Sequence, residues 1–460
     1  MTDVVLVGAG IMSATLAALI RELAPEWHVT VVERLPGAGM ESSHAWHNAG
    51  TGHAGLCEFN YTPRRADGTI DVTAAVRIGE QFATSLVFWA RLVSQGRLAP
   101  DFIRPVPHMG FGRGVDGVAY LRARYAALRD HPLFADLEYT ADRARLAEWL
   151  PLVSAGRTDT VAVTRSPQGT DVDFGRLTRG LLADADVRYG TEVVALRRAG
   201  DHWQVHLSDG TASRARFVFV GAGGATLPLL RSAGVPEVRG LGAFPISGQF
   251  LRTSRPDLVA AHHAKLYGHA EPGAPSISVP HLDSRVVDGT GHLLFGPFAA
   301  FSPRFLAHGR RTDLLRSVHR DNVPALLAAA RDNRGLVAYL VRQLTQTMPG
   351  RLAVLRTFVP AARDEDWELI TAGQRVQVLR RTNGRGTIAG FGTEPVVSAD
   401  GTLAGLLGSS PGASSAPATM IDILARCFPA WRPRLRDLAD DDLTEARKTL
   451  GLTGKSDDLP

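Results

Sequence analysis

Cysteine and lysine are scarce in this chain of 460 residues. The two cysteines, Cys57 and Cys427, cannot form a disulfide framework, so we expect a reducing, intracellular environment. No run of about 20 apolar residues occurs, and the sequence therefore predicts no membrane-spanning helix. The first basic residue is Arg21, so the basic segment that opens a signal peptide is missing, and we expect no such peptide.

The sequence also lacks the short motifs of several enzyme classes. No HExxH, Walker or CxxC pattern occurs. Three histidines, His262, His263 and His269, lie close together, but no carboxylate or cysteine spacing completes a set of metal ligands, so no metal site is expected. Charged residues make up 21% of the chain and hydrophobic residues 45%, as in ordinary globular proteins, which excludes global disorder.

The N-terminal residues have the pattern of a strand, a helix and a second strand. Residues 3–8 are a short apolar run that ends in glycine, residues 11–23 have helical spacing, and residues 28–33 are another apolar run. Two apolar strands joined by a helix indicate a βαβ unit and hence a parallel sheet.

The turn after the first strand has the residues of a dinucleotide-binding site. Gly8 can form the tight turn, Gly10 lets the backbone approach a pyrophosphate, and Ser13 is small enough for close packing of helix on strand. Glu33 ends the second strand, where a carboxylate binds a ribose hydroxyl and would repel the 2′-phosphate of NADP.

A second glycine turn favours FAD over NAD. Gly221 to Gly224 follow another buried apolar strand, and Gly221 and Gly223 are the residues we expect to contact the cofactor. A return of the chain to the cofactor after a later strand of the same sheet is typical of FAD domains. The residues therefore predict FAD, with neither NAD nor nucleic acid as a partner.

The remaining segments alternate between helical and strand-like patterns. An Asp-Gly pair at 209–210 marks a hairpin, and residues 241–300 have the pattern of short strands and turns. Helices are predicted at 71–97, 119–149, 309–346, 353–382 and 417–427, with a loop at 100–117.

We therefore predict an α/β protein, α+β overall, whose Rossmann-like FAD-binding domain is built from separated segments. These segments are residues 1–65, 165–240 and 385–430. An inserted substrate-binding or cap domain of mixed sheet and helices takes residues 66–164 and 241–384, and residues 431–460 form a helical tail.

Blocks of residues from residue 4 to about residue 425 resemble malate:quinone oxidoreductases, in the same order along the chain. The blocks are ESS at 41–43, WHNAGTGHAGLCE at 46–58, NYTP at 60–63, QGTDVDFG at 168–175, VPHLD at 279–283 with Arg285, GPF at 296–298, AGQRVQ at 372–377, GTE at 392–394 and GSSPGAS at 408–414. Ser13, His47 and Ser410 depart from the family pattern, and none of these departures removes a reactive group.

The resemblance implies an FAD enzyme that oxidises (S)-malate to oxaloacetate and passes electrons to a membrane quinone, ubiquinone or menaquinone. It also implies a peripheral protein on the cytoplasmic face of the cell membrane, related to D-amino-acid and L-2-hydroxyglutarate oxidases. Further FAD contacts are expected at Arg34, Ser42, Ser43, Gly50, Thr51, Gly52 and Val193. The segment with Gly408, Pro411, Gly412 and Ala413 is expected at the pyrimidine end of the flavin, because a helix N-terminus stabilises negative charge there.

Oxidation of a 2-hydroxy acid needs a base for the hydroxyl proton and cations for the carboxylates. His281 and Arg285 lie four residues apart, so on a strand they share a face and can act as base and carboxylate anchor. His53 competes for the role of base, because the similar loop of hydroxyglutarate oxidases lies beside the flavin. Arg375 is a second candidate anchor for a substrate with two carboxylates.

Two alternatives remain open at this point. The same motifs fit an FAD oxidase or dehydrogenase of another 2-hydroxy acid, such as L-2-hydroxyglutarate, and a flavin-binding module without turnover. The residues near Phe428, Trp431 and Arg432 mix aromatic rings with cations, so they could touch an anionic membrane surface or form a solvated helix end.

Overall fold

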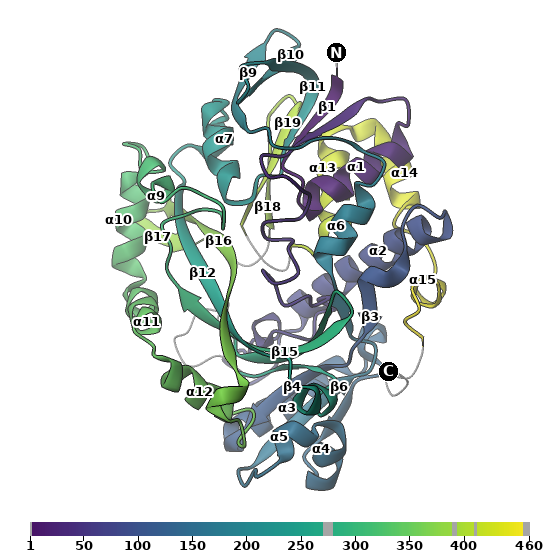
Figure 1. The fold of residues 1–460 in the computed structure, drawn as a ribbon, viewed down its shortest axis with the longest axis vertical. Coiled ribbons are helices and arrows are strands. Elements are labelled where there is room, and N and C mark those ends of the chain that lie inside the picture. The colour runs from purple at the N-terminus through teal and green to yellow at the C-terminus, as the bar shows by residue number, and fades with distance from the viewer. Residues whose placement is uncertain (1, 270–278, 389–392, 409–411, 454–460) are drawn as a thin grey trace.

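The computed structural model describes residues 2–269, 279–388, 393–408 and 412–453. The molecule is elongated, with one large sheet in its upper part and a second, strongly curved sheet below it (Figure 1). A short two-stranded ladder pairs β3 (Ile103–Pro105) with β7 (Thr170–Val172). The fold is thus α/β with more than one mixed sheet, as predicted.

The upper sheet has eight strands drawn from distant parts of the chain. Five of them, β19, β11, β1, β2 and β8, are parallel neighbours, and β18, β10 and β9 add antiparallel pairs. Their bounds are β1 (Thr2–Val7), β2 (Val29–Val32), β8 (Asp186–Arg188), β9 (Val193–Ala199), β10 (His202–Leu207), β11 (Ala212–Val220), β18 (Thr393–Val397) and β19 (Leu403–Gly408).

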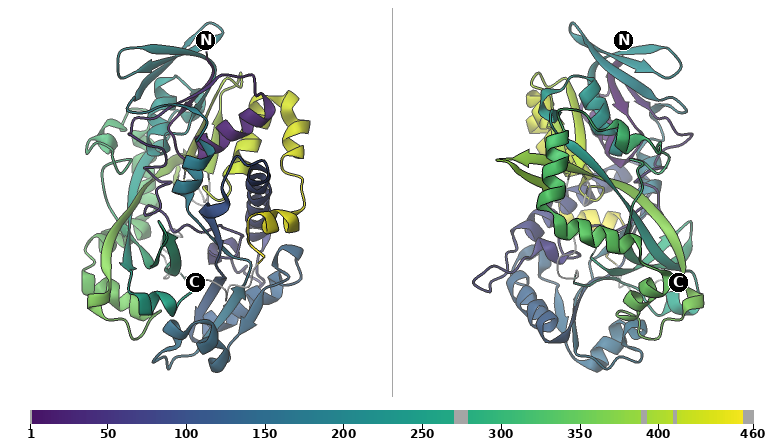
Figure 2. Two further views of the ribbon diagram at one scale, coloured as in Figure 1. Left: turned by 45° about the vertical axis from the view of Figure 1, so that its right-hand side comes forward. Right: turned by 90° about the vertical axis from the view of Figure 1, so that its left-hand side faces the viewer.

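Strand β1 is buried on both faces, which explains its uninterrupted apolar sequence. Val4 and Leu6 belong to the core on the side of helices α1 (Ile11–Leu23), α6 (Phe174–Leu181), α13 (Ala416–Cys427) and α2 (Thr73–Ser94). Val5 and Val7 belong to the core on the other side, beneath α7 (Thr226–Ser232) and the β9–β10 hairpin. Figure 2 shows the N-terminal helix, in purple, packed beside the C-terminal helices, in yellow, in this half of the molecule.

The lower sheet has nine strands in the order β17-β16-β12-β15-β14-β13-β4-β6-β5. Their bounds are β4 (His108–Arg113), β5 (Glu138–Thr140), β6 (Val161–Ser166), β12 (Gly242–Thr253), β13 (Lys265–Tyr267), β14 (His281–Val287), β15 (Thr290–Ala300), β16 (Glu368–Thr382) and β17 (Arg385–Ile388). The helices that pack against this sheet are α3 (Gly114–Leu128), α4 (Arg143–Trp149), α5 (Pro151–Ser154), α8 (Pro256–Ala260), α9 (Asp313–Arg316), α10 (Val323–Asp332), α11 (Arg334–Leu344) and α12 (Met348–Arg356).

The helix predicted over 353–382 is wrong for most of its length. Helix α12 ends at Arg356, and β16 is a strand of 15 residues that pairs with β12 along almost its whole length. The predicted loop over 100–117 contains β3 and β4, and the predicted helix over 119–149 ends at Leu128 and is followed by β5. Pairing with partners far along the chain outweighs the local helical pattern here.

The C-terminal segment forms two short helices, α14 (Arg432–Asp437) and α15 (Leu443–Thr449). The ring of Phe428 stacks on Trp431 with centroids 4.6 Å apart, and both rings contact Trp27. These aromatic rings are therefore engaged in packing within the chain. Residues 454–460 of the predicted tail lie outside the described residues. Within the described ranges, no helix combines the length and the apolar character needed to cross a bilayer.

Candidate active site

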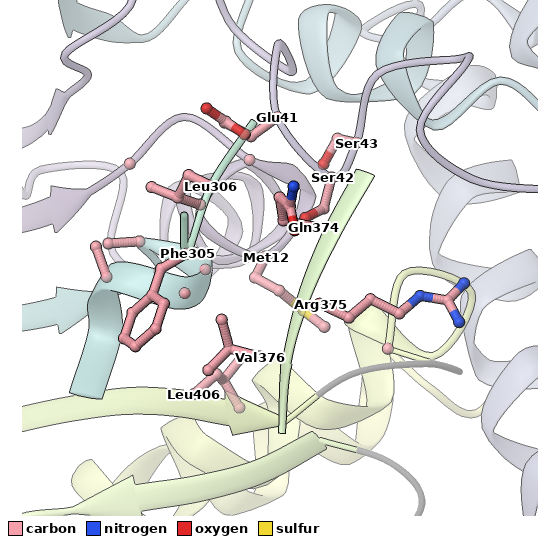
Figure 3. A pocket seen from close by; sticks show the side chains of 18 of the residues that line it. Met12, Glu41, Ser42, Ser43, Phe305, Leu306, Gln374, Arg375, Val376 and Leu406 are labelled. Atoms are coloured by element: carbon pink, nitrogen blue, oxygen red, sulfur yellow. The ribbon is translucent and has the colours of Figure 1, made fainter. Parts of the chain in front are cut away.

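A cavity of about 880 Å³ is lined by residues from both large sheets. Figure 3 shows Phe305, Leu306 and Val376 forming an apolar part of its wall. In the same view Gln374 and Arg375 leave strand β16 in different directions.

At one end of the cavity three neighbouring parallel strands, β11, β1 and β2, finish side by side. Gly221, Gly8 and Glu33 follow directly after these strands. The N–H of Gly8 donates to the carbonyl of Val32 at 2.8 Å, and the N–H of Gly221 donates to the carbonyl of Val7 at 2.9 Å. These hydrogen bonds hold the turns after the strands close together, and a ligand bound at this end of the cavity would contact their backbone.

Gly8 cannot be replaced by a residue with a side chain without strain. Its φ is +92°, and a Cβ atom would lie 2.8 Å from the carbonyl oxygen of Gly221. Helix α1 begins at Ile11, with Gly10 as its N-cap and no acidic residue in its first turn. Its N-terminal dipole therefore favours an anionic group such as a pyrophosphate.

The carboxylate of Glu33 is held in place by the backbone around it. It accepts hydrogen bonds from the N–H of Ala9 at 2.7 Å and of Leu35 at 2.8 Å, and Glu33 also lines the cavity. Ser43 lines the same region, and its hydroxyl accepts from the N–H of Ile11 at 3.0 Å. The close glycine turn, the N-terminus of helix α1 and the fixed carboxylate fit the pyrophosphate and ribose of FAD.

The loop of residues 44–58 is fastened by a buried ionic network. Asp171 lies 2.9 Å from Nζ of Lys265 and 3.2 Å from Nε of Arg285, and all three side chains are almost fully buried. Lys265 donates to the carbonyl of Ala49 at 2.8 Å, and Arg285 donates to the carbonyl of Asn48 at 2.6 Å. The two cations therefore position the loop that brings His53 to the cavity.

Arg285 itself does not line the cavity. It lies on the same face of β14 as His281, as its spacing predicted, but four residues span about 13 Å along a strand. Gly50, with a φ of +63°, packs directly on the Arg285 and Asp171 side chains. In this structure Arg285 supports the loop and does not reach a substrate in the cavity.

His281 faces the cavity from the first position of β14. Its Nδ1 atom lies 2.6 Å from Oδ2 of Asp283, and its ring stacks on Tyr267 with centroids 4.5 Å apart. Burial acts to raise the pKa of Asp283, but His281 and Lys265 lower it, and this pKa lies below its ordinary value. An ionised Asp283 at this position orients the imidazole and leaves Nε2 for the cavity.

His53, Glu58 and Arg375 also line the cavity. Burial lowers the pKa of His53 to about 3, so this imidazole is neutral at pH 7. Its Nδ1 atom is buried and has no hydrogen-bond partner among the described residues. Burial raises the pKa of Glu58 to about 7, against the opposing effect of Arg375. The pocket thus combines the neutral imidazole of His53 with a guanidinium.

Most of the predicted contact residues lie along this cavity. Besides those described above, they are Arg34, Ser42, Thr51, Val193, Gly223, Gly408, Gly412 and Ala413. Ser13 and Gly52 do not line it: Ser13 is buried beneath Gly221, and Gly52 packs against Thr170 and Phe82. Pro411 lies outside the described residues.

Sequence reasoning missed Asp283, Lys265, Glu58, Tyr267 and Gln374. Asp283 could have been found, because it lies two residues from His281 and a strand repeats its faces every two residues. Lys265 and Tyr267 come from β13, which pairs with β14 opposite Asp283 and His281. Only the pairing of the strands identifies them. Within the described ranges no group of three histidine, cysteine or acidic residues could hold a metal ion.

Comparisons with known proteins agree with this geometry. A family model described as malate:quinone oxidoreductase (Mqo) matches residues 1–446. A probable malate:quinone oxidoreductase of Rhodococcus jostii is 51% identical over 456 residues, which are 95% of this chain and 90% of the relative. A probable malate:quinone oxidoreductase 1 of Pseudomonas putida is 50% identical over 456 residues, 95% of this chain and 91% of the relative.

Solved structures share the fold at low sequence identity. An L-α-glycerophosphate oxidase from Mycoplasma pneumoniae with FAD bound has a TM-score of 0.60 at 15% identity, covering 92% of this chain and 94% of its own. A glycine oxidase from Geobacillus kaustophilus has a TM-score of 0.60 at 15% identity, covering 93% and 94%. With the family model and relatives at about half identity over nearly the whole chain, this protein belongs to the malate:quinone oxidoreductase family.

Proposed function

We propose that the chain is an FAD-dependent malate dehydrogenase that oxidises (S)-malate to oxaloacetate and delivers the electrons to a membrane quinone. The observation that carries this proposal is that one cavity has both a dinucleotide cradle at β1, β2 and β11 and a base and a guanidinium elsewhere on its wall. The upper sheet serves as the FAD-binding domain, assembled from the separated segments, and the lower sheet with its helices covers the substrate.

Gly8, Gly10, Glu33 and Gly221 would hold the pyrophosphate and ribose of FAD, and the residues around Gly50 and Gly412 would lie at its flavin. When bound, FAD supplies the acceptor for the hydride that leaves C2 of the substrate. The chain's own residues supply the other requirements, which are orientation of the substrate and removal of the hydroxyl proton.

His281 is the residue we assign as base for the malate hydroxyl. Its Nδ1 contact with Asp283 fixes the ring and stabilises the imidazolium that forms when Nε2 takes the proton. His53 lacks a carboxylate partner of this kind, and its pKa of about 3 makes it a weak base. We therefore assign His53 to a contact with the substrate or the cofactor.

Arg375 is the residue we assign as carboxylate anchor. Its guanidinium lines the cavity and can bind a carboxylate through two hydrogen bonds. The side-chain oxygen Oε1 of the neighbouring Gln374 is buried without a hydrogen-bond partner among the described residues. The Gln374 amide is thus available to help hold the substrate.

The acceptor is proposed to be a ubiquinone or menaquinone in the inner face of the cell membrane, where the protein is bound peripherally. We test the reaction anaerobically by adding (S)-malate to the purified flavoprotein. The visible absorption of the oxidised flavin should disappear, a soluble quinone analogue should restore it, and NAD should not. A flavin that stays oxidised with malate would contradict the proposed substrate.

The resemblance to hydroxyglutarate oxidases supports a second candidate function, oxidation of another 2-hydroxy acid. L-2-hydroxyglutarate in place of malate distinguishes the two. Faster reduction of the flavin by hydroxyglutarate, with peroxide formed in air, would favour the second function. We expect malate to react faster and the quinone analogue to be required for turnover.

A further inference from the structure

An apolar and arginine-rich surface covers the outer side of helices α9, α10 and α11. We call it the α9–α11 face and define its apolar part by Leu315, Val318, Leu327, Val337, Val341 and Leu344. The side chain of Leu315 is 75% exposed, that of Leu327 is 67% exposed and that of Val341 is 56% exposed. In the right-hand view of Figure 2 these green helices face the viewer around the middle of the molecule.

The apolar residues follow helical spacing on the side of the helices that faces away from the protein. In α10 the inward positions are the small residues Ala325, Ala328 and Ala329, which are buried, whereas Leu327 points outward. In α11 Val337 and Val341 repeat at an interval of four residues on the outside. A helix on a surface in contact only with water has polar residues on that side. We therefore expect the exposed apolar side chains of the α9–α11 face to contact an apolar partner.

The charge of this segment is as unusual as its exposed apolar residues. Residues 301–344 contain eight arginines and three aspartates, with no lysine or glutamate, which is a net charge of +5. The net charge of the whole chain is also +5, so the remaining residues sum to zero. Arg311, Arg320 and Arg334 are exposed among the apolar side chains. An apolar stripe bordered by cations complements an anionic lipid surface.

The α9–α11 face also adjoins the cavity. Arg310, Arg316 and His319 line the cavity, and Leu315 and Val318 lie between them in the sequence with their side chains exposed. One short segment therefore has one side in the cavity wall and the other in the apolar face. A surface docked here lies directly against the wall of the active-site cavity.

We propose that the α9–α11 face docks on the surface of an anionic lipid bilayer, with its leucine and valine side chains among the headgroups and its arginines against lipid phosphates. The inference rests on the proposed function, because a lipid-dissolved quinone needs the cavity close to the bilayer. A second copy of the chain is a poorer occupant, because a symmetric contact would place the arginines of one face against those of the other. The C-terminal rings of Phe428 and Trp431 contribute less, since they pack on Trp27.

The test uses the full flavoprotein with vesicles of phosphatidylcholine, or of an equal mixture of phosphatidylcholine and phosphatidylglycerol. Wild-type protein should sediment with the mixed vesicles and bind the neutral ones much more weakly. The apolar variant L327E/V341E and the charge variant R311Q/R320Q/R334Q should each bind the mixed vesicles at least tenfold more weakly, because each arginine near an anionic surface contributes about 1 kcal/mol.

Matched controls change the same residue types elsewhere on the surface. Val115, which is 80% exposed on α3, gives the apolar control V115E, and exposed arginines outside the face give R77Q/R197Q/R214Q. Both controls should bind the mixed vesicles as the wild type does. Equal binding by the face variants and the wild type would overturn the proposal, and so would a dimer in sedimentation velocity that these variants abolish while vesicle binding is unchanged.

A second readout separates this inference from the proposed function. With a short-chain quinone analogue dissolved in water, all variants should oxidise malate at the wild-type rate. With a long-chain quinone in the mixed vesicles, only the face variants should lose activity, at least tenfold. Loss of reaction with the soluble analogue in the wild type would contradict the proposed function. Retained vesicle activity in the face variants would contradict only the docking surface.

Discussion

At the scale of single residues, the two histidines in the cavity differ in what surrounds them. His281 has an ionised carboxylate 2.6 Å from Nδ1, whereas burial lowers the pKa of His53 to about 3 without a comparable partner. A base must gain stability when it takes the proton, and Asp283 provides it through direct contact with His281.

The first prediction concerns this difference. Replacing His281 by Gln should slow reduction of the bound flavin by malate by about 10²- to 10⁴-fold, the usual contribution of a general base. His53→Gln should have a much smaller effect on the same step. Stopped-flow absorbance under anaerobic conditions measures both. Equal losses in the two variants, with FAD still bound, would contradict the assignment of His281.

The second prediction concerns the pH dependence of malate binding. Burial raises the pKa of Glu58 to about 7, so this carboxyl is largely neutral below pH 7 and ionised above it. An ionised Glu58 attracts Arg375 and competes with the malate carboxylate. We therefore expect the KM for malate to rise as the pH increases through 7, and Glu58→Gln to remove most of this rise. Steady-state kinetics between pH 6 and pH 8.5, taken as an approximate window around that pKa, tests it.

At the scale of elements, the cofactor cradle depends on strand ends that lie very close together. The turn after β1 passes within contact distance of the turn after β11, and Gly8 has a φ of +92° at this point. The close approach comes from parallel pairing of the two strands, so a change at one turn is felt by the other.

The third prediction concerns FAD occupancy, and it separates the effect of an atomic clash at the glycine turn from the effect of backbone strain. Gly8→Ala places a Cβ atom 2.8 Å from the Gly221 carbonyl oxygen and should lower FAD occupancy sharply. Gly210→Ala is the matched control, because Gly210 has a φ of +84° in the β10–β11 hairpin with nothing within 4 Å of the added atom. Both variants carry a strain of about 1 kcal/mol, but only the first should lose flavin. The ratio of flavin to protein absorbance after purification measures this, and an equal loss in both would contradict it.

At the scale of the whole molecule, the fold keeps several histidines neutral in its interior. Burial lowers the pKa of His53 to about 3 and the pKa of His108 and His262 to about 4, well below the value of 6.5 in an unfolded chain. His108 and His262 are almost fully buried and contact backbone carbonyls at 3.0 and 3.2 Å.

The fourth prediction is a loss of stability in mild acid. Between pH 6.5 and about 4 the unfolded chain binds protons on these histidines and the folded chain does not, so the free energy of unfolding falls as the pH falls. Each group contributes a slope of about 1.4 kcal/mol per pH unit. Glu58 acts in the opposite direction between pH 7 and 4.5, but it is one group against three.

Urea unfolding of the flavoprotein at several pH values tests this slope. His262→Gln should reduce the slope by about one proton. A free energy of unfolding that is constant from pH 6.5 to 4.5 would contradict the prediction.

The sequence by itself determined the βαβ unit, its glycine turns and the carboxylate of Glu33. These features depend on residues close together in the chain, and the apolar runs and turn glycines indicate them directly. The blocks that resemble the family also located most of the cavity lining, because the loop of residues 44–58 and the glycine turns come to the site as intact segments.

Tertiary structure alone decided which partners these segments meet. Residues 368–382 became a strand because β12 and β17 pair with it on either side. Arg285 was drawn away from the cavity because Asp171 and the carbonyl of Asn48 surround its guanidinium. Which apolar residues of α10 and α11 are exposed on the α9–α11 face likewise depends on the side of each helix that packs on the sheet. Strand pairing and burial of charge join residues far apart in the chain, and spacing in the sequence does not specify those partners.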